Sequence, residues 1–351
     1  MANLTPHLME TMTPSNSSSA PPADAQDQAE RFREVFTKLK TEVHKAFVGQ
    51  DEVVESVISV LLSDGHLLLE GVPGLGKTLL AHTLARTLLL DFSRIQFTPD
   101  LMPADIVGTM VLHEKEGGGH ELRFQEGPVI SNFILADEIN RATPKTQSAM
   151  LEAMQERQVS VARQTIRLPE PFIVIATQNP VEQDGTYPLP EAQLDRFMIK
   201  LVVSYPGEAD YLGILNRTTG TRTSEIQPVS NGPEIMKMRE IVRSVPVSEQ
   251  VQRYAVRMVM ATQPGSTYAT EKVNRTVALG ASPRGVQSLI LMGKVRALVG
   301  GRFAVSCQDI RDVAVPVLRH RVILGFEGLS ARVNPDELIR EIIGSLKELS
   351  A

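Results

Sequence analysis

The chain has 351 residues, of which 42% are hydrophobic and 22% charged, with a formal net charge of −5. This balance is typical of a globular protein with enough apolar material for a core, so disorder throughout the chain is excluded. Uninterrupted apolar stretches of about 18 to 20 residues, which a membrane-spanning helix needs, are absent from the sequence. The single cysteine, Cys307, excludes an internal disulfide framework and favours a reducing, cytoplasmic compartment.

The first 27 residues differ in composition from the rest of the chain. They are rich in Ser, Thr, Pro, Ala and Asn and hold few large apolar residues, so we expect residues 1–27 to form a disordered tail. Residues 1–30 also contain four acidic side chains and no lysine or arginine. Without these four, 37 acidic residues stand against 36 basic ones. A dedicated nucleic-acid binder usually carries a clear basic excess, so this near-neutral body disfavours nucleic acid as a partner.

From residue 28 onward the hydrophobic pattern alternates between helical and strand-like periods. Apolar residues recur at helical spacing over residues 32–43 and again over 53–62. Short apolar runs then predict strands with helices between them. The expected strands cover residues 66–70, 94–97, 133–136, 172–177 and 197–203. This alternation predicts a parallel α/β sheet with helices on both faces, in a domain that spans residues 28–205.

Two hairpins and a helical domain complete the predicted architecture. Residues 110–113 and 121–124 flank three glycines and predict one inserted hairpin, and residues 159–161 and 165–167 predict a second. After residue 206 only helical patterns follow. Ser282-Pro283 and Asn334-Pro335 are typical helix starts, with a polar N-cap and proline in the first turn. We therefore expect a smaller, all-helical domain over residues 206–351.

Residues 71–78 fit the phosphate-binding loop pattern in full, between an apolar strand and a helix. Its glycines let successive backbone N–H groups converge on phosphate oxygens, and the positive end of the new helix points at the same place. Lys77 would bridge the β- and γ-phosphates of ATP, and the Thr78 hydroxyl would ligate Mg²⁺. The alternative is an ordinary glycine turn. The expected nucleotide-binding residues here are Gly71, Val72, Pro73, Gly74, Leu75, Gly76, Lys77, Thr78 and Leu79.

A second motif places two carboxylates at the end of the strand predicted over residues 133–136. Carboxyl ends of parallel strands form the edge at which α/β sheets bind ligands, so Asp137 and Glu138 would lie beside the phosphate-binding loop. Asp137 would orient Mg²⁺, and Glu138 would polarise the attacking water. A simple strand end is the alternative interpretation.

Three longer motifs resemble those of the MoxR family of AAA+ ATPases. They are QFTPDLMPAD at residues 96–105, DEINRATPKTQSAMLEAMQE at 137–156 and LPEAQLDRF at 189–197. Thr143 stands where the family pattern has proline. The resemblance runs from about Phe47 to the C-terminus and leaves the acidic tail outside. It implies the P-loop AAA+ fold, in which a parallel sheet with flanking helices and hairpin insertions precedes a helical lid.

The resemblance also implies roles for residues outside the first two motifs. Asn179 matches the sensor 1 residue, which positions the lytic water. Arg196 matches the arginine finger, which acts on the nucleotide of the neighbouring subunit. Arg284 matches sensor 2, which reaches from the lid to the γ-phosphate. Val48 and Gly49 resemble the segment that flanks the adenine.

Two arginines can be judged by elementary electrostatics as well. Arg284 would lie in the first turn of a helix, where the macrodipole disfavours a cation, so an anion is expected beside it. Arg141 follows the carboxylate pair closely. It could contact a nucleotide across an interface, but a structural salt bridge is the favoured role.

Taken as a family member, the chain would form a homo-oligomeric ring, expected to be a hexamer, because an arginine finger needs a neighbour. ATP hydrolysis would drive chaperone-like remodelling or maturation of a protein client, such as cofactor insertion. A partner with a von Willebrand factor A domain would assist, and the hairpins would face the central pore or remain in solvent. Two alternatives stay open. A nucleic-acid motor is disfavoured by the near-neutral body and the absence of Trp, and a nucleotide-gated scaffold with little turnover is disfavoured by Glu138.

Overall fold

The computed structural model describes residues 24–114, 119–162, 164–180, 185–219 and 225–347. The expected tail therefore lies almost wholly outside the described residues. Helix α1 (Ala25–Val43) begins three residues before the boundary expected at Gln28. Within the described part of the chain, no helix combines the length and apolar character needed to cross a membrane.

The centre of the first domain is a five-stranded sheet of order β2-β5-β8-β1-β9, in which every neighbouring pair is parallel. The carboxyl ends of all five strands therefore lie at one edge of the sheet, and their amino ends lie at the other. All five strands were expected from the sequence, with ends shifted by at most two residues. They are β1 (Leu67–Glu70), β2 (Phe92–Gln96), β5 (Phe133–Asp137), β8 (Ile173–Gln178) and β9 (Ile199–Val202).

Each face of the sheet is covered by its own hydrophobic cluster, because successive side chains of a strand point to opposite faces. Leu67 and Leu69 belong to a cluster with α1 and the helices α2 (Asp51–Leu62) and α3 (Lys77–Thr87). Leu68 belongs to the other cluster, with α5 (Pro144–Glu156). Strands buried on both faces explain why their sequences are almost continuously apolar.

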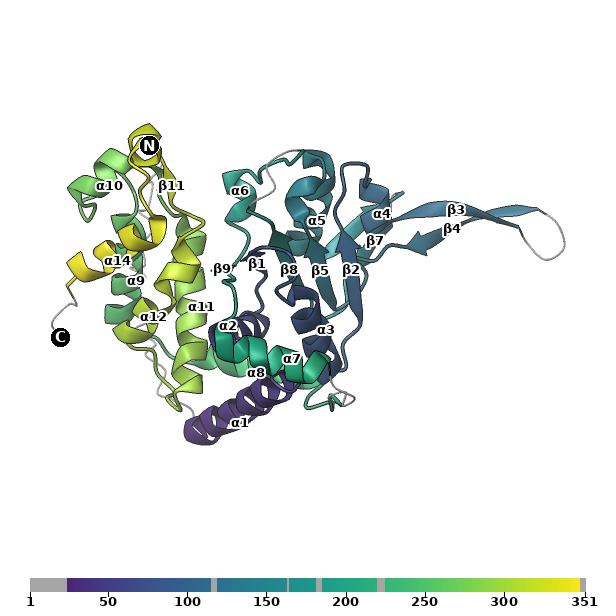
Figure 1. The fold of residues 1–351 in the computed structure, drawn as a ribbon, viewed down its shortest axis with the longest axis horizontal. Coiled ribbons are helices and arrows are strands. Elements are labelled where there is room, and N and C mark those ends of the chain that lie inside the picture. Colours follow the sequence, from purple (N-terminus) through teal and green to yellow (C-terminus); the bar gives the residue numbers. More distant parts are fainter. Residues whose placement is uncertain (1–23, 115–118, 163, 181–184, 220–224, 348–351) are drawn as a thin grey trace, which may run out of the picture.

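Two hairpins leave this sheet domain, as expected. Strands β3 (Gly108–Glu114) and β4 (His120–Glu126) form a long antiparallel ribbon that projects away from the body, on the side opposite the lid (Figure 1). Leu112 and Leu122 face each other across this ribbon and are both more than 60% exposed. The second hairpin pairs β6 (Gln158–Val161) with β7 (Gln164–Arg167).

The lid stands beside the sheet domain and consists mostly of helices (Figure 1). The first cluster continues into it, so the two parts share one core through α1, α2 and α11. The lid is not all-helical as expected, because β10 (Val277–Leu279) and β11 (Ile323–Leu324) form a short antiparallel pair. The helices that follow β9 are α7 (Glu208–Thr218), α8 (Gly232–Ser244), α9 (Glu249–Ala261), α10 (Glu271–Thr276), α11 (Pro283–Val299), α12 (Cys307–Leu318), α13 (Phe326–Ser330) and α14 (Pro335–Ser345).

Both helix starts expected in the lid are present. Ser282 caps α11, and its hydroxyl accepts a hydrogen bond from the backbone N–H of Arg284. Asn334 caps α14 in the same way, through the N–H of Asp336. Each is followed by proline in the first turn, where the missing N–H costs no helical hydrogen bond.

Candidate nucleotide-binding site

The phosphate-binding loop connects the carboxyl end of β1 to the start of α3. The N–H of Gly71 donates to the carbonyl of Gln178 at 3.1 Å, which fixes the loop beside β8. Gly74 and Gly76 have φ values of 86° and 76°, a left-handed conformation that favours glycine. Helix α3 begins at Lys77 with no acidic residue in its first turn, so its N-terminal N–H groups face the loop unopposed by a carboxylate of that turn.

Lys77 is folded back onto the loop. Its Nζ donates to the carbonyls of Gly71 at 2.6 Å and Val72 at 3.1 Å. Burial lowers the pKa of Lys77, while the charges of Asp137 and Glu138 act in the opposite direction. A half-buried cation held by carbonyls and nearby carboxylates is well placed to exchange these partners for phosphate oxygens.

Asp137 ends β5 and is almost fully buried. Its Oδ1 accepts a hydrogen bond of 2.6 Å from the Thr177 hydroxyl. Its Oδ2 accepts two bonds from Arg94 of β2, from Nε at 3.1 Å and Nη2 at 2.6 Å. A carboxylate has about four lone-pair positions, so these contacts leave acceptor capacity for a water or a cation.

Glu138 follows with a left-handed backbone, at a φ of 57°. This turn directs its carboxylate toward β2, where Oε2 accepts from Gln96 Nε2 at 3.0 Å and from Arg141 Nη1 at 2.9 Å. The salt bridge favoured for Arg141 is thus present. The N–H of Glu138 donates to the Thr177 hydroxyl at 2.8 Å, so Thr177 links both carboxylate residues to β8.

Asn179 is the first residue after β8 and is buried. The preceding residue, Gln178, is in register with Glu70 of β1 and accepts the hydrogen bond from Gly71. Asn179 therefore lies at the same edge as the phosphate-binding loop and the two carboxylates, as its expected role requires.

Val48 and Gly49 form a wall next to α7. Gly49 has a φ of 67°, and a Cβ added there would lie 2.4 Å from the Asp210 carboxylate of α7. A Cβ on Gly213 would come within 2.8 Å of Val48. Phe47 is in similarly close contact with Gly76. The segment expected to flank the adenine is thus tied both to α7 and to the phosphate-binding loop.

Arg196 and Arg284 lie elsewhere in the same chain. Both line a cavity of about 240 Å³, together with residues 64–66, Arg157 and Arg321. His66 directly precedes β1, whereas the phosphate-binding loop directly follows it, so this cavity is at the amino edge of the sheet. Four strand residues separate the two edges by roughly 13 Å. The structure brings Arg196 and Arg284 together, and it does not bring either to the phosphate-binding loop of its own chain.

The anion expected beside Arg284 is a carboxylate of the protein. Arg284 lies in the first turn of α11, with Nη1 at 3.8 Å from Oδ2 of Asp195. Its side chain is 45% exposed, so this pair leaves the guanidinium accessible to a further anion. The cavity as a whole holds four arginines against Asp64 and Asp195.

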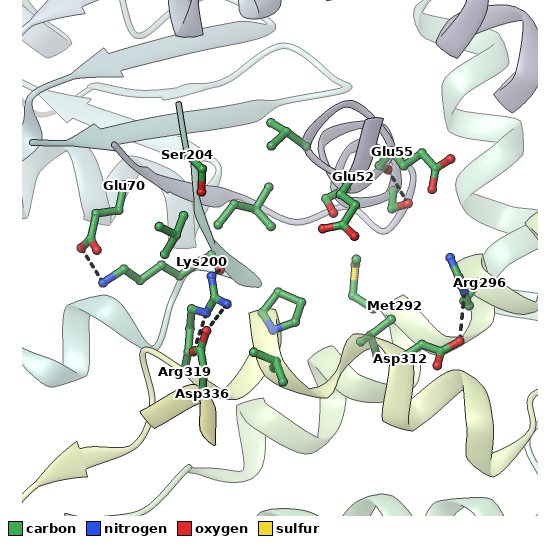
Figure 2. Close-up of a pocket in the computed structure, with 18 of the residues that line it drawn as sticks. Glu52, Glu55, Glu70, Lys200, Ser204, Met292, Arg296, Asp312, Arg319 and Asp336 are labelled. Carbon is green, nitrogen blue, oxygen red and sulfur yellow. Dashed lines mark hydrogen bonds and ion pairs between the residues drawn. The ribbon is translucent and has the colours of Figure 1, made fainter. Parts of the chain in front are cut away.

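A larger cavity of about 870 Å³ separates β9 and α2 from lid helices α11, α12 and α14 (Figure 2). Ion pairs stand in its walls: Lys200 contacts Glu70 at 2.6 Å, and Arg296 contacts Asp312 at 3.3 Å (Figure 2). None of residues 71–78 lines it. This cavity is therefore distinct from the phosphate-binding loop.

Sequence reasoning missed three residues that hold the carboxylates, namely Arg94, Gln96 and Thr177. For Gln96 and Thr177 the usable signal was position, because each is polar and lies at or near the carboxyl end of an expected strand. Arg94 carried no such signal, since it begins the strand expected over residues 94–97. Asp210 of α7 carried no comparable signal, because its contact with Gly49 depends on how the chain folds back after β9.

Comparison with known proteins agrees with this geometry. Residues 66–199 match the ATPase family associated with various cellular activities (AAA), and residues 270–342 match the AAA lid domain. Chaperone MoxR1 of Mycobacterium tuberculosis is 44% identical over 92% of this chain and 85% of its own length. Protein MoxR of Methylorubrum extorquens is 31% identical, over 89% of this chain and 94% of its own length.

A crystal structure from Cytophaga hutchinsonii, described as that of a candidate ATPase, superimposes with a TM-score of 0.87. It is 39% identical in sequence, and the match covers 93% of this chain and 98% of that one. The motifs, the fold and these relatives lead to one conclusion: the chain belongs to the MoxR family of AAA+ ATPases.

Proposed function

We propose that this protein hydrolyses ATP at sites shared between neighbouring copies in a ring, and that hydrolysis remodels or matures a protein client. The observation that carries the proposal is the separation of the two sets of residues. Lys77, Asp137, Glu138 and Asn179 gather at the carboxyl edge of the sheet, whereas Arg196 lines a cavity at the amino edge. One chain alone cannot bring both to a single nucleotide without a large rearrangement, but two adjacent copies can.

In this proposal the nucleotide phosphates bind the loop at residues 71–78, with Val48 and Gly49 beside the base. Glu138 accepts a proton from the attacking water and Asn179 orients that water. Arg196 and Arg284 of the adjacent copy supply positive charge as the γ-phosphate leaves, which is the role of an arginine finger. The resemblance to sensor 2 implies that Arg284 reaches the γ-phosphate from the lid. Because Arg284 shares a cavity with Arg196, it acts in this proposal on the nucleotide of the adjacent copy.

Mg²⁺ is the metal that this donor set fits. Thr78 offers a hydroxyl in the first turn of α3, and Asp137 offers carboxylate oxygens, which are the hard donors that Mg²⁺ prefers. Both oxygens of Asp137 already have protein partners, so Asp137 would hold the ion through water. When bound, Mg²⁺ would neutralise charge on the β- and γ-phosphates.

The proposal of client remodelling rests on a relative's name and on one exposed surface of this chain. MoxR1 of M. tuberculosis is named a chaperone. In this chain, the exposed Leu112 and Leu122 on the projecting β3–β4 ribbon offer an apolar contact for a client (Figure 1). We further propose a hexamer, a partner with a von Willebrand factor A domain, cofactor insertion as one kind of maturation, and a cytoplasmic location consistent with the single, free Cys307.

Mixed rings test the shared site. Arg196→Ala subunits lack the finger and Glu138→Gln subunits lack the base, so neither alone should release phosphate at an appreciable rate. Mixing them creates interfaces with one intact finger and one intact base, and hydrolysis should return in part. Mass photometry would confirm that the two variants assemble together. Co-assembly without any recovery, at every mixing ratio, would refute the shared site.

A further inference from the structure

One buried arginine of the lid binds the segment that carries the finger. Arg321 lies three residues past α12, and its side chain is only 1% exposed. Its Nη2 donates to the carbonyls of Asp195 at 3.2 Å and Phe197 at 2.7 Å, and its Nη1 donates to that of Met198 at 3.1 Å. Arg321 thus binds the backbone on both sides of Arg196.

The carboxylate next to the finger completes this network. Asp195 Oδ1 accepts from Arg321 Nε at 2.9 Å, and Oδ2 accepts from the Ser282 hydroxyl at 2.7 Å. Ser282 is also the N-cap of the helix whose first turn holds Arg284. Asp195 therefore joins the finger segment to the start of α11. Its Oδ2 also lies 3.8 Å from Nη1 of Arg284.

Arg196, by contrast, has a buried nitrogen, Nε, that makes no hydrogen bond within the described residues. The position of its guanidinium thus depends on the backbone of residues 195–198, and the lid holds that backbone. Burial lowers the pKa of Arg321 to about 10, with Asp195 acting in the opposite direction, so Arg321 stays charged at neutral pH.

We propose that Arg321 and Asp195 are positioning residues, which hold Arg196 and Arg284 as one unit directed at the nucleotide of the adjacent copy. The inference rests on the shared site proposed above. A finger displaced by about 1 Å can lose roughly 100-fold in rate, so a clamp on its backbone has a direct effect on hydrolysis. Because the clamp belongs to the lid, a lid movement in one subunit moves the finger in the next site.

The chain offers a matched control for this clamp. Arg319 is two residues before Arg321 and makes a similar two-bond ion pair, with Asp336 at 3.0 and 2.6 Å. Arg319 also donates to the carbonyl of Lys200 in β9. Within the described residues, it makes no hydrogen bond to residues 195–198. Arg319→Lys should therefore disturb the lid to a comparable degree and leave the finger in place.

The experiment compares Arg321→Lys, Asp195→Asn and Arg319→Lys. Lysine keeps the charge of Arg321 but cannot make its several planar contacts at once. Asparagine keeps an acceptor for Ser282 but loses the charge that pairs with Arg321. We expect kcat to fall about 10- to 100-fold in the first two variants, with the affinity of their own site for nucleotide unchanged. Arg319→Lys should stay within about 2-fold of the wild type in kcat.

Mixing with Glu138→Gln subunits separates positioning from a general loss of structure. An Arg321→Lys subunit keeps its loop and base, so an intact finger from a Glu138→Gln neighbour should restore its hydrolysis. A fall in kcat without recovery, or no fall at all, would overturn the inference. If thermal unfolding shows that the Arg321→Lys variant is not folded, the Asp195→Asn variant provides the test instead.

The Arg196→Ala and Glu138→Gln mixture serves as the reference. When the reference recovers and the Arg321→Lys and Asp195→Asn mixtures do not, only the clamp is wrong. When the reference itself shows no recovery, the shared site is wrong, and the clamp is rejected with it.

Discussion

The carboxyl edge of the sheet gathers polar residues that lie at strand ends, whereas the amino edge gathers arginines from segments far apart in the chain. At the first edge, Asp137 and Glu138 follow β5 and Asn179 follows β8. At the second, Arg196 precedes β9 and Arg284 belongs to the lid. The first set is fixed by strand order alone. The second exists only because the lid packs against the sheet domain.

The two edges also differ in charge. Carboxylates at the carboxyl edge are paired with Arg94 and Arg141, which holds them in place before any nucleotide binds. The amino-edge cavity has more arginines than carboxylates. In the shared site proposed above, the carboxyl edge of one copy would face this basic edge of the next, which would supply positive charge to the phosphates.

The largest expected effect is at the carboxyl edge. Glu138→Gln should reduce kcat for ATP hydrolysis roughly 100-fold or more, because the amide cannot accept the proton of the attacking water. Nucleotide affinity should persist, since the amide occupies the same space. Steady-state phosphate release measures the first quantity and fluorescent-nucleotide titration the second. Glu152→Gln, at an exposed position of α5, is the control, and near-normal turnover of Glu138→Gln would assign the base elsewhere.

Lys77→Ala should weaken ATP binding about 10- to 100-fold, because the loop loses its charge-assisted contact with the terminal phosphates. Equilibrium titration with a fluorescent ATP analogue measures the change. Lys272→Ala removes a lysine from a partly exposed ion pair with Glu341 and should leave affinity unchanged. Equal affinities for Lys77→Ala and the wild type would contradict the assignment of the phosphate-binding loop.

At the amino edge, stability should depend on pH through two buried histidines. Burial lowers the pKa of His66 well below its ordinary value, and the Arg157 and Arg239 charges act in the same direction. Burial does the same to the pKa of His320, which contacts the carbonyl of Phe197, with Arg321, Lys200 and Arg319 adding to the shift. The folded state therefore stays unprotonated at these sites while the unfolded chain takes up protons below pH 6.5.

Stability should accordingly be complete above about pH 7.5 and fall as the pH decreases through the unfolded-state pKa of about 6.5. At pH 5.5 the loss should be on the order of 1 kcal/mol for each histidine. Urea unfolding at pH 7.5, 6.5 and 5.5 gives the free energy directly. His320→Gln should remove about half of the pH dependence, and an unchanged slope in that variant would show that other groups produce it.

The smallest effect is expected at the wall beside the phosphate-binding loop. Gly49→Ala should cost about 1–2 kcal/mol of stability, because its φ of 67° strains an L-residue and its Cβ meets Asp210. Gly344→Ala is the matched control, since its Cβ would meet no atom within 4 Å in α14. That change should stabilise the protein by up to about 1 kcal/mol. Chemical denaturation compares the two, and equal midpoints would contradict the strain at Gly49.

The sequence alone predicted the sheet domain in detail, because strands buried on both faces leave continuous apolar runs that end in recognisable motifs. Two such motifs are Asp137, at the end of the run over residues 133–136, and the glycines of the phosphate-binding loop, after the run over residues 66–70. It also predicted the helix starts at Ser282 and Asn334, since capping is a local interaction. It did not predict β10 and β11, because strands of three and two residues carry no period. The division into domains at residue 205 stays a prediction.

Local sequence thus identified the candidate phosphate-binding residues and where the strands that carry them end, because both depend on contacts within a few residues. Tertiary structure decided the partners of those residues. Gln96 reaches Glu138 only through the register of β2 with β5, and Arg321 reaches Asp195 across 126 positions of sequence. The first contact depends on strand pairing and the second on how the lid packs against the sheet domain, and no local pattern encodes either.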